Sequence, residues 1–356
     1  MRCDAPGAGV NLWRTAAVPP PPFRLASTLP AGLDFTSLVA MKNRRDFIKT
    51  GLALGATFSL ADLGGLFAAD APDGAASGPA AAGSARPILI AVRDGDRVAM
   101  LDKALEALGG IGAFVKPGQT VVIKPNIGWD VPPERCANTH PDLVRHLAKV
   151  CLQAGAKSVS IFDCTCDYWQ STYATSGIAQ AAREAGAQVV PGDDDTLYRE
   201  VAIPRGVKLR RARVHSLVLD SNVFINLPVL KHHGGALMTA CMKNLMGVVS
   251  KRDQQHYHRE DLHQCIADFL TFRQPTLNVL DAYSPMVRNG PRGKTADDLV
   301  VMRSLLASTD IVAIDAAAAR LLGHQPADVR HVRLAAELNV GTLDLNAVDI
   351  RRFKLA

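Results

Sequence analysis

The chain has 356 residues, 48% of them hydrophobic and 21% charged, which is ordinary globular composition for one large or two smaller domains. Its formal net charge of +6 comes without a run of basic residues, so nucleic acid is not an expected partner. The seven cysteines match no zinc or ferredoxin spacing, and a chain of this size does not need a disulfide framework.

An export signal is the first predicted element. Asn43-Arg44-Arg45-Asp46-Phe47-Ile48-Lys49 is followed by an apolar, Gly/Ala-rich run from Gly51 to Ala69. This pattern predicts a twin-arginine signal over residues 41–71, which the twin-arginine translocation machinery would recognise. We therefore expect a periplasmic or exported protein, anchored in the membrane if the signal stays uncleaved. An ordinary amphipathic helix is the alternative.

The segments on either side of this signal differ in composition. Residues 1–40 are Pro-rich and lack a pattern, and Met41 stands directly before the charged part of the signal. We expect translation to begin at Met41 and residues 1–40 to be a mispredicted extension. Residues 72–86 are rich in Ala, Gly, Pro and Ser and predict a flexible linker. The folded domain is expected over residues 87–356.

Strands and helices alternate through most of this domain. Apolar runs predict strands, and apolar residues spaced by three and four predict helices. The expected strands are 87–92, 120–123, 158–162, 187–190, 214–219, 223–227, 276–280, 300–306 and 348–353, and the expected helices are 98–108, 141–154, 178–185, 262–272, 310–322 and 329–338. This order favours an α/β fold with a mainly parallel sheet and helices on both faces. A smaller inserted subdomain is an open alternative.

Polar side chains follow four of the expected strands. They are Lys124 and Asn126, Asp163, the run Lys231-His232-His233, and Asp281. The carboxyl ends of parallel strands share one edge of a sheet, where open α/β proteins bind their ligands. Each residue alone is better explained as part of a solvated loop or as a helix cap. Their coincidence predicts a site at this edge.

Lysines determine the charge of the predicted site. Lys124 and Lys231 would make it electropositive and suited to a carboxylate or phosphate. Lys243 and Asn244 lie in a helix-spaced segment that follows the second of these strand ends, and they would add an ammonium and an amide if they face inward. A solvated helix face is the plainer explanation, because both lie off the apolar stripe of that segment. No glycine-rich phosphate-binding motif is present.

A metal ion is a candidate cofactor. His232, His233, His256 and His258 could supply nitrogen ligands, with Asp163 or Asp281 supplying oxygen, although no spacing typical of a metal site supports this. Cys164 and Cys166 could chelate a soft metal, form a redox pair or a disulfide, or have no role.

Several motifs are shared with a known family. Residues 87–356 resemble the proteins catalogued as domain of unknown function 362, and the resemblance rests on Val122–Asn126, Phe224–His233, Met242–Gly247, Tyr257-His258, Gly290–Gly293 and Ala307–Asp315. The family pattern of Lys, any residue, His makes His233 a better candidate than His232. The family has no general assigned activity. Many members carry an attached iron–sulfur segment with closely spaced cysteines, which is not found in this sequence.

The leading hypothesis is an exported α/β enzyme that acts on a small anionic substrate. His233, His258 and Lys231 are the candidate catalytic residues, and the candidate substrate-binding residues are Lys124, Asn126, Lys243, Asn244, Asp163 and Asp281. A histidine that titrates near neutral pH is a natural proton carrier. The first alternative is a periplasmic metal- or iron–sulfur-linked redox accessory protein with Cys164, Cys166, His233, His258 and Asp281 as ligands. The second is a ligand-binding protein without catalysis. The sequence does not indicate the oligomeric state.

Overall fold

The computed structural model describes residues 86–356 of the chain. The predicted extension, the twin-arginine signal and almost all of the predicted linker lie outside the described residues. None of the helices within residues 86–356 is long and apolar enough to cross a membrane.

A mixed sheet of ten strands forms the centre of the described region. Its main path runs in the order β12-β1-β11-β10-β7-β2-β3-β4, and β8 and β9 extend it beside β10. All strands run in one direction except β11 and β9, which are antiparallel to their neighbours. The strands are β1 (Ile88–Arg93), β2 (Thr120–Pro125), β3 (Ser158–Ile161), β4 (Gln188–Val189), β7 (Val223–Leu227), β8 (Val229–His233), β9 (Leu237–Thr239), β10 (Leu277–Met286), β11 (Ser304–Ser308) and β12 (Asp349–Lys354).

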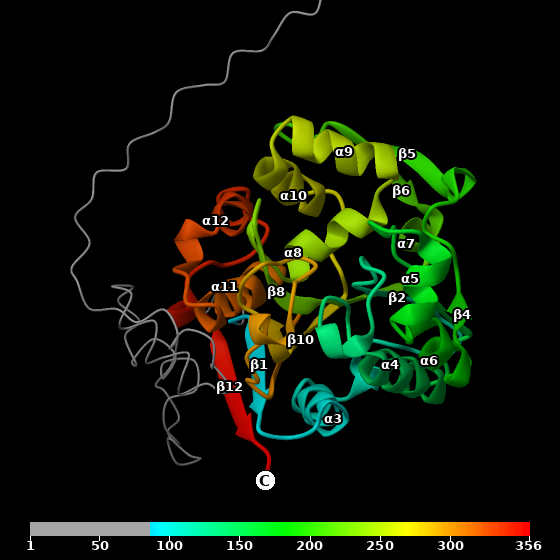
Figure 1. Ribbon diagram of the computed structural model, residues 1–356, viewed down its shortest axis with the longest axis vertical. Coiled ribbons are helices and arrows are strands. Elements are labelled where there is room, and N and C mark those ends of the chain that lie inside the picture. The colour runs from blue at the N-terminus through cyan, green and yellow to red at the C-terminus, as the bar shows by residue number, and fades with distance from the viewer. Residues whose placement is uncertain (1–85) are drawn as a thin grey trace, which may run out of the picture. The chain divides into compact units, whose positions relative to one another are not determined.

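Helices cover both faces of this sheet, so the predicted α/β fold is confirmed (Figure 1). The helices are α3 (Arg97–Ala107), α4 (Pro141–Gln153), α5 (Trp169–Thr175), α6 (Ile178–Glu184), α7 (Ser216–Asp220), α8 (Cys241–Asn244), α9 (Lys251–Arg259), α10 (Leu262–Leu270), α11 (Ile311–Leu321) and α12 (Arg330–Glu337). Strand residues alternate between two hydrophobic cores. Val122 packs with α10, α11 and α12, whereas Val121 and Ile123 pack with α3, α4 and α6. This alternation is the two-residue period of a strand buried on both faces.

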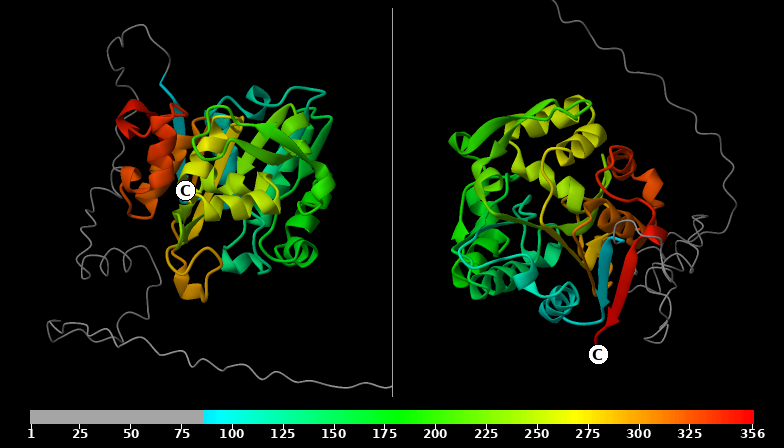
Figure 2. Two further views of the ribbon diagram at one scale, coloured as in Figure 1. Left: turned by 90° about the horizontal axis from the view of Figure 1, so that it is seen from above. Right: turned by 180° about the vertical axis from the view of Figure 1, so that it is seen from behind.

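The chain from β7 to β8 positions the site. It passes Pro228 and runs alongside β10, which pairs first with β7 and then with β8. Strand β2 pairs with β7 only as far as Leu227, so β8 continues past the carboxyl end of β2. The residues at the ends of β2 and β3 therefore lie beside β8. At the other side of the sheet, β1 and β12 lie next to each other (Figure 2).

The segment after β8 differs from the helix predicted for it. The apolar spacing from Leu237 to Val248 is divided among strand β9, the four-residue helix α8 and a short 3-10 helix, Leu245–Val248. The buried carboxylate of Asp315, on α11, accepts the backbone N–H groups of Cys241 (2.7 Å) and Met242 (3.0 Å) and so fixes the start of α8. Burial raises the pKa of Asp315 to about 7. A tertiary contact therefore forms this helix, which explains why local spacing misplaced it.

One other predicted strand also changes, and one helix was not predicted. The strand expected over residues 214–219 is instead the end of β6 (Arg211–His215) followed by helix α7. Strand β6 pairs with β5 (Tyr198–Ala202) as a separate two-stranded sheet. The polar segment after residue 250 forms α9, capped by the side chain of Ser250, which accepts the N–H of Asp253.

Candidate functional site

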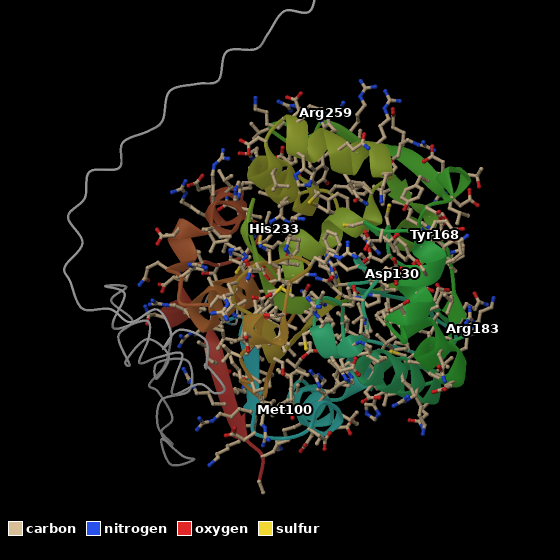
Figure 3. The ribbon with its side chains drawn as sticks, in the orientation of Figure 1. Met100, Asp130, Tyr168, Arg183, His233 and Arg259 are labelled. Atoms are coloured by element: carbon tan, nitrogen blue, oxygen red, sulfur yellow. The ribbon has the colours of Figure 1, made fainter. Side chains whose placement is uncertain are left out.

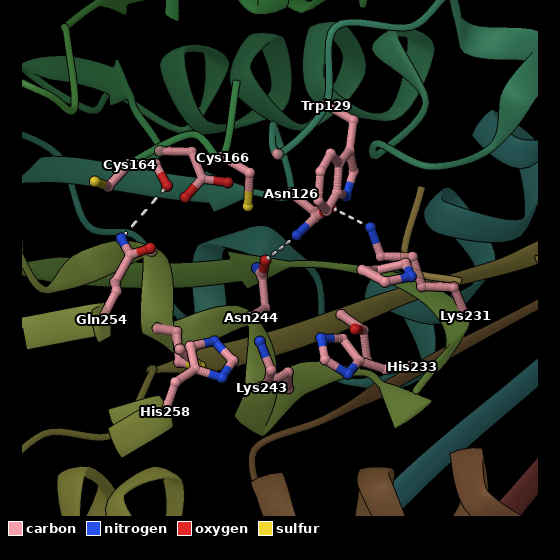
Figure 4. Close-up of a pocket in the computed structure, with 16 residues that line it drawn as sticks. Asn126, Trp129, Cys164, Cys166, Lys231, His233, Lys243, Asn244, Gln254 and His258 are labelled. Atoms are coloured by element: carbon pink, nitrogen blue, oxygen red, sulfur yellow. Dashed lines mark hydrogen bonds between the residues drawn. The ribbon is translucent and has the colours of Figure 1, made fainter. Parts of the chain in front are cut away.

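A pocket of about 290 Å³ lies at the carboxyl ends of β2 and β3. Strand β8 and helices α8 and α9 supply its other walls (Figure 4). The size is at the lower end of the range of about 300–1,000 Å³ for small-molecule sites, which suits a small ligand. The residues that line it include Asn126, Trp129, Asp163, Cys164, Cys166, Lys231, His233, Lys243, Asn244, Gln254 and His258. Seven of the nine predicted site residues are therefore brought together here, the exceptions being Lys124 and Asp281.

A buried ion pair forms the floor beneath the pocket. The Nζ atom of Lys124 lies 2.8 Å from Oδ1 of Asp163, and both side chains are almost fully buried. Lys124 also donates to the carbonyl of Pro125 (2.7 Å) and to Oδ1 of Asn244 (3.0 Å), so its three N–H groups are all used. Burial lowers the pKa of Lys124 and raises that of Asp163, and the attraction between them opposes both shifts. Lys124 thus holds Asp163 and Asn244 in position without lining the pocket itself.

A chain of side-chain amides connects this floor to the sheet. Asn244 accepts from Asn126 (3.0 Å) and donates to Oδ1 of Asn226 (2.8 Å). Asn226 in turn donates to Asn278 (2.9 Å) and to the carbonyl of Cys241 (2.9 Å). Each amide is buried or partly buried and has its partners at normal distances, as a stable buried polar network requires. This network fixes the orientation of Asn126 and Asn244.

Lys231 reaches the pocket from β8. Its side chain is 1% exposed, and Nζ donates to Oδ1 of Asn126 at 2.8 Å and to the carbonyl of Ala137. An ammonium group has three N–H donors, so one remains for a ligand. Burial, together with the neighbouring Lys243, lowers the pKa of Lys231 to about 7.

Lys243 also lines the pocket but has a different environment. Its ammonium group forms no hydrogen bond or ion pair with any residue in the described range 86–356, and Figure 4 shows it between His233 and His258. Burial lowers the pKa of Lys243 to about 8, and Lys124 contributes to this shift. All three of its donors are therefore free to meet a ligand.

The two candidate histidines differ in what they can do. Nδ1 of His233 accepts the backbone N–H groups of Gly235 and Ala236, both at 3.1 Å, which places its proton on Nε2. Burial lowers the pKa of His233 to about 3, with Lys243 and Lys231 adding to the shift. His233 therefore stays neutral and acts as a hydrogen-bond donor. His258 lies on α9 and is exposed at the rim of the pocket. Figure 3 labels His233 on β8 and Arg259, which follows His258 on α9. Partial burial, followed by Lys243, lowers the pKa of His258.

The two cysteines after β3 form no disulfide, and their side chains have different environments. Cys164 is buried, whereas Cys166 is exposed and its sulfur points toward Asn244 in Figure 4. Backbone bonds from Cys164 to Gly247 and from Cys166 to Gly128 hold the loop in place. Within residues 86–356, no three His, Cys, Asp or Glu side chains are grouped as metal ligands.

Asp281 is not part of the pocket, unlike the prediction. Strand β10 continues five residues beyond it to Met286, so Asp281 lies within the strand and not at its end. Its carboxylate pairs with Arg97 at 3.3 Å, and the Arg97 guanidinium stacks on the ring of Tyr283. Asp281 thus forms an ion pair on β10, beside strand β8, and we do not include it among the proposed substrate-binding residues.

Some pocket residues were not predicted. Trp129 follows Asn126 by three residues in the same loop, so its place after a strand end was a usable signal. Gln254 comes from α9, where it donates to the carbonyls of Val249 (3.2 Å) and Cys164 (3.5 Å). Nothing in a highly polar helix distinguishes that residue from its solvated neighbours.

Comparison with known proteins gives one family and several more distant similarities. The chain is 28% identical over 252 residues to a thylakoid-associated protein of Synechocystis, covering 66% of this chain and 73% of that protein. The lactate racemase apoprotein of Thermoanaerobacterium thermosaccharolyticum aligns with a TM-score of 0.37 and 10% identity over 70% of this chain. A Thermotoga maritima protein aligns with a TM-score of 0.38 and 8% identity over 67% of this chain. The chain spans 56% and 59% of those two structures.

The family resemblance inferred from the motifs is confirmed by a direct match. A family model matches residues 121–320, which is more than half of the 356-residue chain and includes all the residues that line the pocket. The chain therefore belongs to the family described as Domain of unknown function (DUF362).

Proposed function

We propose that the pocket binds a small anion and that the protein is an enzyme acting on a small anionic substrate. The observation that carries this proposal is the free ammonium group of Lys243, which faces the same pocket as the remaining N–H of Lys231. Among the described lining residues, Asp163 is the one carboxylate, and it is paired with Lys124. The pocket therefore has unbalanced positive charge, which a carboxylate or phosphate would neutralise.

The side chains around these lysines have distinct proposed roles. Lys231 and Lys243 would bind the anionic group, and the amides of Asn126 and Asn244 would hold Lys231 and Lys124 in place. Neutral His233 would donate a hydrogen bond from Nε2. His258, at the rim, is the better proton carrier because it has contact with solvent and no protein hydrogen bond within the described residues.

Binding of small acids tests this function. Calorimetry is carried out with a panel of carboxylates and phosphate, and the neutral amide of each carboxylic acid is the control ligand. At least one anion is expected to bind, and where it is a carboxylate its amide should not bind. Lys231→Met and Lys243→Met should each weaken that binding by about 10- to 100-fold, because a hydrogen bond to a charged group contributes about 1.5–3 kcal/mol.

Lys149 provides the matched control variant. It is an exposed lysine on α4, away from the pocket, so Lys149→Met changes the net charge equally and should leave affinity unchanged. Unaltered affinity in both pocket variants would contradict the proposal. Conversion of the bound acid to a product would separate an enzyme from a ligand-binding protein without catalysis.

A further inference from the structure

The two pocket lysines differ in how their nitrogen atoms are held. The ammonium group of Lys231 is fixed by Asn126 Oδ1 and by the carbonyl of Ala137, so loss of its proton weakens an existing arrangement. Lys243 has no such acceptor within residues 86–356. Its nitrogen can therefore lose a proton without leaving a hydrogen-bond acceptor unsatisfied, and its lone pair can turn toward a ligand.

The surroundings of Lys243 favour its neutral form more than an exposed site would. The buried Lys124 and Lys231 are both in the floor or wall of the same site, and Asp163 is engaged by Lys124. A desolvated amine beside other cations is the arrangement that makes a lysine nucleophilic. Burial lowers the pKa of Lys243 to about 8, so roughly a tenth of these amines are neutral at pH 7. Burial also lowers the pKa of Lys231, to about 7, and a carboxylate bound at Lys231 would raise that pKa again and keep this lysine a cation.

We propose that Lys243 forms an imine with the carbonyl carbon of a small 2-oxo acid whose carboxylate is held by Lys231. This inference rests on the proposed anion site and specifies its substrate class. In a 2-oxo acid the carbonyl carbon is bonded directly to the carboxylate carbon. One small molecule can therefore present an anionic group to Lys231 and an electrophile to Lys243. The size of the pocket suits such a molecule.

The proposed step is balanced without an oxidant or reductant. The Nζ lone pair of Lys243 forms a C–N bond as the carbonyl π electrons move to oxygen, and proton transfer gives a carbinolamine. Uptake of one proton lets the hydroxyl leave as water, which gives the protonated imine. His258 or solvent at the rim can carry these protons. The iminium group withdraws electrons from the neighbouring C3 carbon, which prepares that carbon for loss of a proton.

Reductive trapping tests this step on the full-length protein. Incubation with pyruvate or glyoxylate and borohydride is expected to add the mass of the acid less one oxygen atom, and peptide mapping should place the addition on Lys243. Lys243→Arg keeps the positive charge and should abolish trapping at this position. Lys231→Met should slow trapping at Lys243, and Lys149→Met should leave it unchanged.

A 2-hydroxy acid separates the failure of this inference from failure of the anion site. Lactate has the carboxylate but no carbonyl, so it reports on anion binding alone. If lactate binds and neither oxo acid is trapped on Lys243, or trapping occurs on Lys231 or on surface lysines, the imine inference is overturned and the anion site stands. If neither lactate nor any other acid binds, the proposed function fails as well. Because the position is mapped in the wild-type protein, the test does not depend on the folding of a variant.

Discussion

Gly247→Ala is expected to reduce the free energy of unfolding by about 3–5 kcal/mol, because it would disrupt a buried ion pair. A Cβ atom at residue 247 would overlap Oδ1 of Asp163 and lie 2.7 Å from Cε of Lys124. The carboxylate cannot move away easily. Its Oδ1 contacts Lys124 at 2.8 Å, and its Oδ2 accepts the backbone N–H of Ile127 at 2.7 Å. Gly247 is therefore required for close approach of the backbone to the pair.

Gly128 supplies a control in the same pocket. A Cβ atom there would lie 3.8 Å from Oδ1 of Asn126 and 4.0 Å from the sulfur of Cys166, which are ordinary contacts. Gly128→Ala should change stability by no more than about 1 kcal/mol. Urea unfolding followed by circular dichroism would compare the two variants. Equal stabilities would contradict the prediction, because they would show that the Lys124–Asp163 pair can shift to make room for a methyl group.

Lys124→Met is expected to destabilise the protein by about 3–5 kcal/mol at neutral pH, because it leaves the buried Asp163 carboxylate without its cation. It also removes one of the two donors to Oδ1 of Asn244. The remaining bond from the Ile127 N–H does not compensate for a buried charge. The main expected effect is therefore a loss of stability. Anion binding should also weaken, because Asn244 and Asn126 lose part of the network that orients them.

The loss in Lys124→Met should depend on pH. Without Lys124, burial raises the folded-state pKa of Asp163 still further above its unfolded value, because the ammonium group that opposed this shift is gone. A group with a raised folded pKa stabilises the folded state at low pH and loses that contribution as pH rises through the folded pKa. The deficit against wild type should therefore be smaller at pH 5 than at pH 8 in urea unfolding. A deficit independent of pH would contradict this account, and Lys149→Met should stay within about 0.5 kcal/mol of wild type.

Much of the fold could be predicted from local sequence. Strand β7, helix α4 after Pro141 and helix α11 after Asp310 lie within a residue or two of the expected bounds, because a buried apolar run or a cap marks each end. The side chain of Asp310, for example, accepts the N–H groups of Val312 and Ala313. The antiparallel direction of β11 and the short helix α8 depend on contacts between distant segments, which local patterns do not contain.

The candidate site was predicted in outline and refined in detail. Lys231 and Asn126 belong to strands that end at a common edge, so a parallel sheet brings them together. Local spacing placed Asn244 on a solvated helix face, whereas Asn226 and Asp315 draw its segment into the interior. Asp281 was misplaced because the apolar pattern ends before strand β10 does. Burial and neighbouring charges, which set whether His233 can carry a proton, depend on the tertiary structure.

The pH dependence of anion affinity tests most directly whether Lys231 and Lys243 bind the substrate as cations. Each lysine is protonated below its pKa, which burial lowers to about 7 for Lys231 and about 8 for Lys243. Calorimetry with an acid from the panel that is ionised throughout, and that has no keto or aldehyde group to form an imine, should therefore give the highest affinity near pH 6. Affinity should then fall as pH rises through 7 and 8, by up to about tenfold per pH unit for each lysine that must regain its proton. Affinity that stays constant from pH 6 to pH 9 would contradict binding by these two lysines.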